Sequence, residues 1–131
     1  MTIEMTPDEL RRQLAPRKYR NVRVVVDGLP FASKAEARRY TDLKLLQQTG
    51  EISGLVLQPC YVLLDGYLDG PSKWVRPIVY VSDFAYRERG NTRIVVEDVK
   101  GGKGTQTAVF RLKARLFRQK YPNLDFRIVE A

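Results

Sequence analysis

The stretch of sequence that decides the fold is residues 76–101, which reads RPIVYVSDFAYRERGNTRIVVEDVKG. Two β-rich runs, at residues 76–87 and 92–101, flank the pair Gly90-Asn91, which is typical of a hairpin turn. The pattern therefore predicts two antiparallel strands whose register is set by the position of this turn.

The predicted register places Asp83 directly opposite Asp98 on one face, with their Cβ atoms about 5 Å apart. Two such carboxylates repel each other unless a proton or a cation lies between them, and divalent ions such as Mg²⁺ bind through oxygen ligands of this kind. The alternative is that they are unrelated polar residues at frayed strand ends, and a slip of one residue in the register would put them on opposite faces. Glu97 points to the other face, and we expect its substitution to cost about 1 kcal/mol or less, the value of a cross-strand pair.

Two further charged residues are candidates for the same site. Lys100 lies two residues beyond Asp98 on the same side of the strand, either as a solvated charge or as a group that holds a water molecule or a phosphate oxygen. Glu36 falls in the middle of the apolar stripe of a helix predicted over residues 33–48. It forms a capping box with Ser33, and a carboxylate at that angle also needs a buried partner, so both roles are open.

The remaining patterns predict a small α/β domain with the core order α-β-β-β-α-β. A domain over residues 21–131 follows a basic N-terminal arm over residues 1–20. The first helix is expected to bury Tyr40, Leu43 and Leu46, and the second Val109, Phe110, Leu116 and Phe117. The other expected elements are a hairpin over residues 22–31 with its turn at Asp27-Gly28, an apolar strand over residues 54–64, a helix from Thr105 or Thr107 to about Lys120, and a strand over residues 126–129.

The composition favours a polyanionic partner. The 131 residues include 23 Lys plus Arg against 15 Asp plus Glu, which gives a net charge of +8, and there is no histidine. The lack of histidine excludes Ser-His-Asp hydrolases and histidine-metal nucleases, and with a single cysteine, Cys60, it also excludes a four-ligand N/S zinc site. The positive excess is concentrated in residues 11–23 and 111–120, which favours a binding track for nucleic acid.

Candidate contacts to nucleic acid lie in or near these basic segments. Tyr19 either stacks on an exposed base or packs on its own domain. Lys113 lies at the centre of the apolar face of the second helix, with Gln106 on the same line, and either extends to solvent or approaches the acidic cluster. Lys103 lies in a glycine run whose spacing does not match a phosphate loop, but which lets a nucleic-acid backbone come close. The candidates are Arg17, Lys18, Tyr19, Arg20, Lys103 and Lys113.

The sequence also predicts a cytoplasmic protein. No stretch approaches the roughly 18 consecutive apolar residues of a membrane span. The N-terminal residues Glu4, Asp8 and Glu9 are acidic where a signal peptide carries positive charge, so no export signal is expected.

A set of acidic residues and a lysine, in this order of elements, resembles the PD-(D/E)xK nuclease superfamily. The residues that carry the resemblance are Glu36, Asp83, Asp98, Val99 and Lys100. The stretches KYRNVRVVVDG, FASKAEARRY, QPCYVLL, VSDFAY and VVEDVKGG further resemble a family of small phage and prophage proteins assigned to that superfamily. The similarity covers roughly residues 17–129, with Ser82 where the motif name has proline.

The resemblance implies a restriction-endonuclease-like fold, with a mixed central sheet flanked by helices, and hydrolysis of DNA that depends on Mg²⁺ or Mn²⁺. It implies that Asp83 and Asp98 bind the ion, with the Val99 carbonyl completing the site. By the same resemblance, Lys100 orients the attacking water or stabilises charge on the phosphate, and Glu36 adds a ligand or holds one.

The resemblance further implies a phage or prophage protein that acts in the cytoplasm of a bacterial host. No helix-turn-helix or zinc finger is present in the sequence pattern, which favours recognition of DNA shape, as in the cutting of branches or junctions. Small junction resolvases of the superfamily act as symmetric dimers, so a homodimer is one arrangement to expect. Two alternatives are a member that binds nucleic acid without cleaving it and a phage interaction protein that meets an acidic protein.

Overall fold

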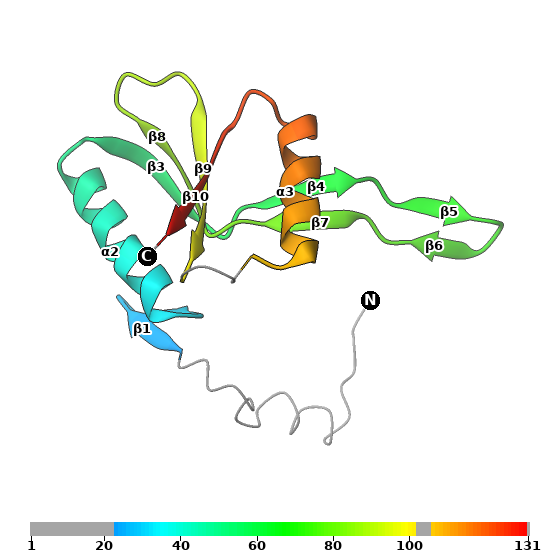
Figure 1. Ribbon diagram of the computed structural model, residues 1–131, viewed down its shortest axis with the longest axis horizontal. Coiled ribbons are helices and arrows are strands. Elements are labelled where there is room, and N and C mark those ends of the chain that lie inside the picture. Colours follow the sequence, from blue (N-terminus) through cyan, green and yellow to red (C-terminus); the bar gives the residue numbers. More distant parts are fainter. Residues whose placement is uncertain (1–22, 102–105, 131) are drawn as a thin grey trace.

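The computed structural model describes residues 23–101 and 106–130, and in these a four-stranded sheet lies between two helices (Figure 1). The helices are α2 (Lys34–Gln48) and α3 (Ala108–Lys120). The strands are β1 (Val24–Val26), β2 (Leu29–Phe31), β3 (Ile52–Leu57), β4 (Cys60–Leu64), β5 (Tyr67–Asp69), β6 (Lys73–Val75), β7 (Ile78–Val81), β8 (Phe84–Glu88), β9 (Ile94–Lys100) and β10 (Asp125–Glu130). The order in the main sheet is β10-β9-β8-β3, which confirms the predicted α/β class.

The N-terminal hairpin and the first helix form as the sequence predicts. Asp27 and Gly28 have φ angles of 53° and 75°, the positive values that a two-residue turn between β1 and β2 requires. The Ser33 side chain caps α2 by accepting a hydrogen bond of 3.1 Å from the backbone N–H of Glu36. Gly50, with a φ of 84°, follows the end of the helix.

The hairpin of β8 and β9 has the predicted register. Its pairs run from Arg87 opposite Ile94 to Phe84 opposite Glu97, and the turn contains Gly90 with a φ of 79°. Strand β10 lies parallel to β9, because α3 carries the chain back to the end of the sheet at which β9 begins. The main sheet is therefore mixed.

Two strands that the sequence predicts as continuous are each divided in two. The apolar strand after α2 divides into β3 and β4 at Gln58, whose φ is 51°, and Pro59. The first strand of the β8–β9 hairpin divides into β7 and β8 at Ser82 and Asp83. The two breaks are joined, since the Gln58 N–H donates to the Asp83 carbonyl at 2.9 Å and the Ser82 N–H donates to the Pro59 carbonyl at 3.1 Å. Both segments of the chain leave the main sheet at this corner. The prediction that each forms one continuous strand was therefore wrong.

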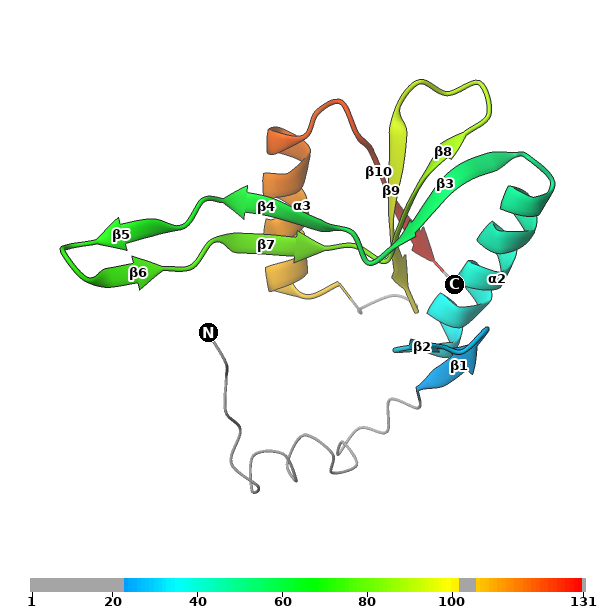
Figure 2. The same ribbon diagram turned by 180° about the vertical axis from the view of Figure 1, so that it is seen from behind.

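Beyond the corner the chain forms a long two-stranded extension. Strand β4 pairs with β7, and β5 pairs with β6, each pair being antiparallel. Figures 1 and 2 show the extension passing α3 and projecting away from the sheet. We call its outer part, residues 65–77, the β-arm; the sequence pattern did not predict β5 or β6.

The two faces of the main sheet bury separate apolar clusters. Phe84 and Val95 face α2, whereas Ala85 and Val96 face α3, as expected for side chains that alternate along a strand. The aromatic ring of Phe117 is fully buried in the cluster beneath α3. Each helix is therefore held to the sheet by its own core.

Two predicted core positions are exposed instead. The exposed fraction of Leu46 is 37%, and that of Val109 is 63%. Each lies near an end of its helix, and the buried residues of α2 stop at Leu43 while those of α3 begin at Phe110. Periodicity locates the apolar stripe but not where the contact with the sheet ends. Neither described helix is long and apolar enough to cross a membrane.

Candidate active site

Asp83 lies at the corner where β7 ends and β8 begins. Its backbone N–H donates to the Glu97 carbonyl at 3.0 Å, and its carboxylate Oδ2 accepts a hydrogen bond of 2.7 Å from the backbone N–H of Val99. Asp83 is one residue outside the β8–β9 ladder, which ends at Phe84. The Asp83 side chain is thus bound to the backbone near the end of β9, next to Asp98.

Glu36 brings a second carboxyl group from α2. Its side chain is buried and shares a hydrogen bond with Asp83, and the charge of Asp98 acts on both. The cap of the helix is made by Ser33 with the backbone N–H of Glu36. The two roles left open by the sequence therefore coexist, because the backbone N–H of Glu36 is capped by Ser33 while its carboxyl group interacts with Asp83 and with the backbone of Ala32.

The crowding of these carboxyl groups changes their ionisation. Burial raises the pKa of Asp83 to about 7, with the charges of Asp98 and Glu36 acting in the same direction and the hydrogen bond from Val99 opposing them. Burial also raises the pKa of Glu36, against the opposing hydrogen bond with Asp83. The pair is therefore more easily protonated than ordinary carboxylates, as expected for acids whose charges are crowded together.

Asp98 and Lys100 form an ion pair on the α3 side of β9. The Lys100 Nζ lies 2.9 Å from Asp98 Oδ1 and 3.7 Å from the centre of the Phe110 ring. The Tyr80 hydroxyl donates to Asp98 Oδ2, and burial together with this hydrogen bond raises the pKa of Tyr80. The Lys100 side chain is only 18% exposed, so it is not a freely solvated charge. Tyr80 was not among the predicted site residues, and no local pattern marks it.

Glu97 points to the α2 side of the sheet, as the strand alternation predicts, and there it forms a buried ion pair. Arg39 donates from Nε to Oε1 at 2.8 Å and from Nη2 to Oε2 at 2.6 Å, and the Tyr86 hydroxyl donates to the same carboxylate. The Glu97 side chain has no exposed surface, and its hydrogen bond raises the pKa of Arg39. Glu97 therefore does more than form the cross-strand pair that the sequence predicts, since its ion-pair partner comes from a helix far away in the sequence.

The acidic residues fit a hard divalent cation in ligand type. Within residues 23–101 and 106–130, no group of three or more His, Cys, Asp or Glu side chains is arranged to hold a metal ion. Mg²⁺, however, commonly binds one or two carboxylates and keeps several waters. Glu36, Asp83 and Asp98 offer only oxygen atoms. Ser82, the residue before Asp83, has a buried hydroxyl with no hydrogen-bond partner among the described residues. In this arrangement, the ligands of the ion would be the carboxylates of Asp83 and Asp98 together with water molecules.

The other predicted site residues are mostly outside the part of the chain that the structure describes. Lys113 is half-buried on α3 and forms no hydrogen bond or ion pair with a described residue, and Gln106 is also half-buried. The predicted contacts that lie outside the described residues are Arg17, Lys18, Tyr19, Arg20 and Lys103.

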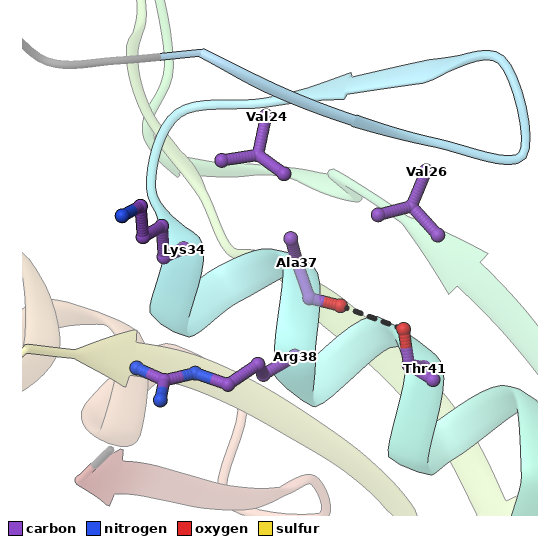
Figure 3. Close-up of a pocket in the computed structure, with 6 residues that line it drawn as sticks. All are labelled: Val24, Val26, Lys34, Ala37, Arg38 and Thr41. Carbon is purple, nitrogen blue, oxygen red and sulfur yellow. Dashed lines mark hydrogen bonds between the residues drawn. The ribbon is translucent and has the colours of Figure 1, made fainter.

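A pocket of about 340 Å³ lies between β1 and α2 (Figure 3). Two of its lining side chains, Lys34 and Arg38, are basic, and none of the acidic candidates lines it. The pocket is therefore separate from the carboxylate site. Its lining residues are Val24, Val26, Lys34, Ala37, Arg38 and Thr41.

Comparison with known protein families gives one match. Residues 16–131 match the family described as "Protein of unknown function (DUF1064)". The chain belongs to this family. The matched region of this DUF1064 member contains Glu36, Asp83, Asp98 and Lys100 and both halves of the β-arm. Searches of the curated proteins and of the solved structures gave no match.

Proposed function

We propose that the protein is a metal-dependent DNA endonuclease of the PD-(D/E)xK type, which hydrolyses phosphodiester bonds. The observation that carries the proposal is the meeting of Glu36, Asp83 and Asp98 at one end of the sheet, beside the ammonium group of Lys100. These side chains come from α2, from the corner before β8 and from β9. An acidic cluster that is partly buried beside a lysine is costly to maintain for stability alone, which favours a functional role.

The chain's own residues have distinct roles in this proposal. Bound Mg²⁺ or Mn²⁺ would supply Lewis acidity and a water of lowered pKa. Asp83 and Asp98 would hold the ion, together with the Val99 carbonyl, and Glu36 would orient Asp83 through their shared hydrogen bond. Lys100, released from Asp98, would donate to a phosphate oxygen and stabilise negative charge as it develops.

The architecture and the charge support DNA as the substrate. A mixed sheet with one helix on each face is compatible with the restriction-endonuclease-like fold that the sequence resembles. The net charge of +8 suits a polyanion, and α3 presents an exposed basic surface made of Arg111, Arg115 and Arg118. The small described domain favours recognition of DNA shape over the reading of a long base sequence.

The first test is cleavage of linear, flapped and four-way DNA in the presence of Mg²⁺, Mn²⁺ or EDTA. We expect cutting with either ion and none in EDTA, with the branched substrates preferred. Asp98→Asn should lower the rate by about 100-fold or more, because it removes a charged ligand. Asp42→Asn is the matched control, since this substitution makes the same change in charge at a residue that is exposed on α2.

A second readout does not depend on cleavage. Mg²⁺ should raise the melting temperature of the wild type and of Asp42→Asn, but not that of Asp98→Asn, because only the folded site binds the ion. Undiminished cutting in EDTA, or full activity of Asp98→Asn, would exclude the proposed site. Salt-sensitive DNA binding without cleavage would favour the non-catalytic alternative, and no DNA binding at all would favour an interaction protein.

A further inference from the structure

The β-arm forms a small sheet of its own, separate from the main sheet. Strands β5 and β6 pair only with each other, and the turn between them contains Gly70 with a φ of 77°. The arm projects from the molecule beyond α3 (Figure 2). A two-stranded hairpin is marginally stable alone in water, so its apolar side chains are expected to have another use.

The β-arm exposes large apolar side chains on both of its faces. The exposed fractions are 57% for Tyr67, 65% for Leu68 and 59% for Trp74. Leu68 and Trp74 are a cross-strand pair and share one face, while Tyr67 points to the other. Exposed apolar side chains gathered on a projecting hairpin mark a binding surface more often than scattered single residues do.

Trp74 is held in place on its inner side. A Cβ atom at Gly66 would lie 2.4 Å from Cζ2 and 2.9 Å from Cη2 of the indole, so the six-membered ring of Trp74 covers Gly66. The remaining 59% of the residue's surface faces solvent. The ring is therefore an ordered aromatic surface, which loses little conformational freedom when a flat ligand stacks on it.

The net charge of the chain and the exposed basic residues of α3 favour an anionic partner, although the acidic and basic residues of the β-arm itself balance. Arg76, two residues beyond Trp74, is exposed and forms no ion pair with a described residue, whereas Lys73 points to the other face of the ladder, opposite Asp69. Asp65, at the base of the arm, lies 4.0 Å from Lys120 of α3, so its charge faces a cation already. A second copy of this chain would bring another +8 toward the same surface, whereas a nucleic acid brings negative charge.

The β-arm is also connected to the proposed active site by α3. Phe110, near the start of α3, contacts Lys100, and Lys120 at its end lies beside the arm. The distance along the helix between these residues is about 15 Å, or on the order of four stacked bases. One nucleic acid can therefore reach both places.

We propose that Trp74 stacks on an unpaired base of the DNA, with Arg76 on an adjacent phosphate, so that the β-arm selects DNA that contains single-stranded or branched segments. This inference rests on the proposed function. A fully paired duplex keeps the faces of its bases stacked on one another, whereas a flap or a junction exposes them to an aromatic side chain. The arm thereby supplies a physical basis for recognition of DNA shape.

The experiment uses Trp74 as its own probe, because it is the only tryptophan in the chain. Short single-stranded, flapped and blunt duplex DNA of one sequence are titrated into the wild type in EDTA, which prevents metal-dependent cutting. Single-stranded and flapped DNA should quench the tryptophan fluorescence, and the blunt duplex should leave it nearly unchanged. Trp74→Leu should weaken binding to flapped DNA about tenfold, and Trp74→Phe should retain most of the affinity. The control is Leu45→Ala, since Leu45 is 60% exposed on α2.

Three results would overturn the inference, and each has a separate signature. Equal binding of flapped DNA by Trp74→Leu and wild type would remove the stacking role, while Mg²⁺-dependent cutting that still needs Asp98 would leave the nuclease proposal standing. Fluorescence that changes with protein concentration, together with a dimer in sedimentation, would assign the β-arm to a second copy. A wild type that binds no DNA even at low salt would end both proposals.

Discussion

Glu97 and Asp98 are neighbours in β9, and their carboxylates lie on opposite faces of the main sheet with different partners. Glu97 binds Arg39 of α2, whereas Asp98 binds Tyr80 and Lys100 on the α3 side. Both side chains are buried, so exposure does not distinguish them. Their partners do, because Glu97 is held by a complete ion pair within the core and Asp98 lies among the acidic residues at the end of the sheet.

Glu97→Gln is expected to lower the free energy of unfolding by about 3 kcal/mol. The substitution leaves the Arg39 guanidinium partly buried without its counter-charge, and breaking a buried ion pair on one side carries a cost of this size. Urea denaturation measures the change. At a temperature where the variant is folded, its Mg²⁺-dependent cutting should stay close to that of the wild type.

The companion measurement is a double-mutant cycle with Arg39→Gln. The double variant should be more stable than the sum of the two single effects predicts, because it leaves no unpaired charge. A change of only a few tenths of a kcal/mol in Glu97→Gln would show that the ion pair contributes little. Loss of cutting without loss of stability would move the site to Glu97.

Lys100→Met is expected to reduce the cleavage rate by about 100-fold or more while leaving DNA affinity nearly unchanged. Methionine keeps the contact with Phe110 but removes the positive charge that would stabilise the transition state. Single-turnover cleavage and DNA-binding titrations separate the two effects. Lys44→Met is the control, since Lys44 forms an ion pair with Asp27 away from the acidic cluster. Equal rates for the two variants would assign Lys100 a structural role.

Reversal of charge at Arg17, Lys18 and Arg20 tests the basic segment that precedes the described residues. The Glu variants should bind DNA more weakly, with a slope of log affinity against log salt that is smaller by up to about three, since each phosphate contact contributes about 0.9. Arg89→Glu, in the turn at the far end of the β8–β9 hairpin, should leave the slope nearly unchanged. An unaltered slope in the triple variant would place this segment away from DNA.

Local sequence was sufficient for the turns, the helix caps and the register. Asp27-Gly28 and Gly90 adopt the positive φ angles that few other residues accept, and Ser33 and Thr107 cap the two described helices. The turn at Gly90 in turn set the pairing of Phe84 with Glu97. These features depend on residues a few positions apart, so the information that determines them is present in short stretches of chain.

The tertiary structure decided where strands are interrupted and which charges meet. Asp83 sits at a corner because Gln58 and Pro59, at the break between β3 and β4, form the other half of it. Glu36 meets Asp83, and Arg39 meets Glu97, only after α2 packs on the sheet. The sequence by itself determined which residues were acidic, which faces they occupied and how two strands align, because side-chain alternation is local. The partner of a buried charge is not determined locally. A buried carboxylate needs a hydrogen-bond donor or a cation, and that group comes from a distant part of the folded chain.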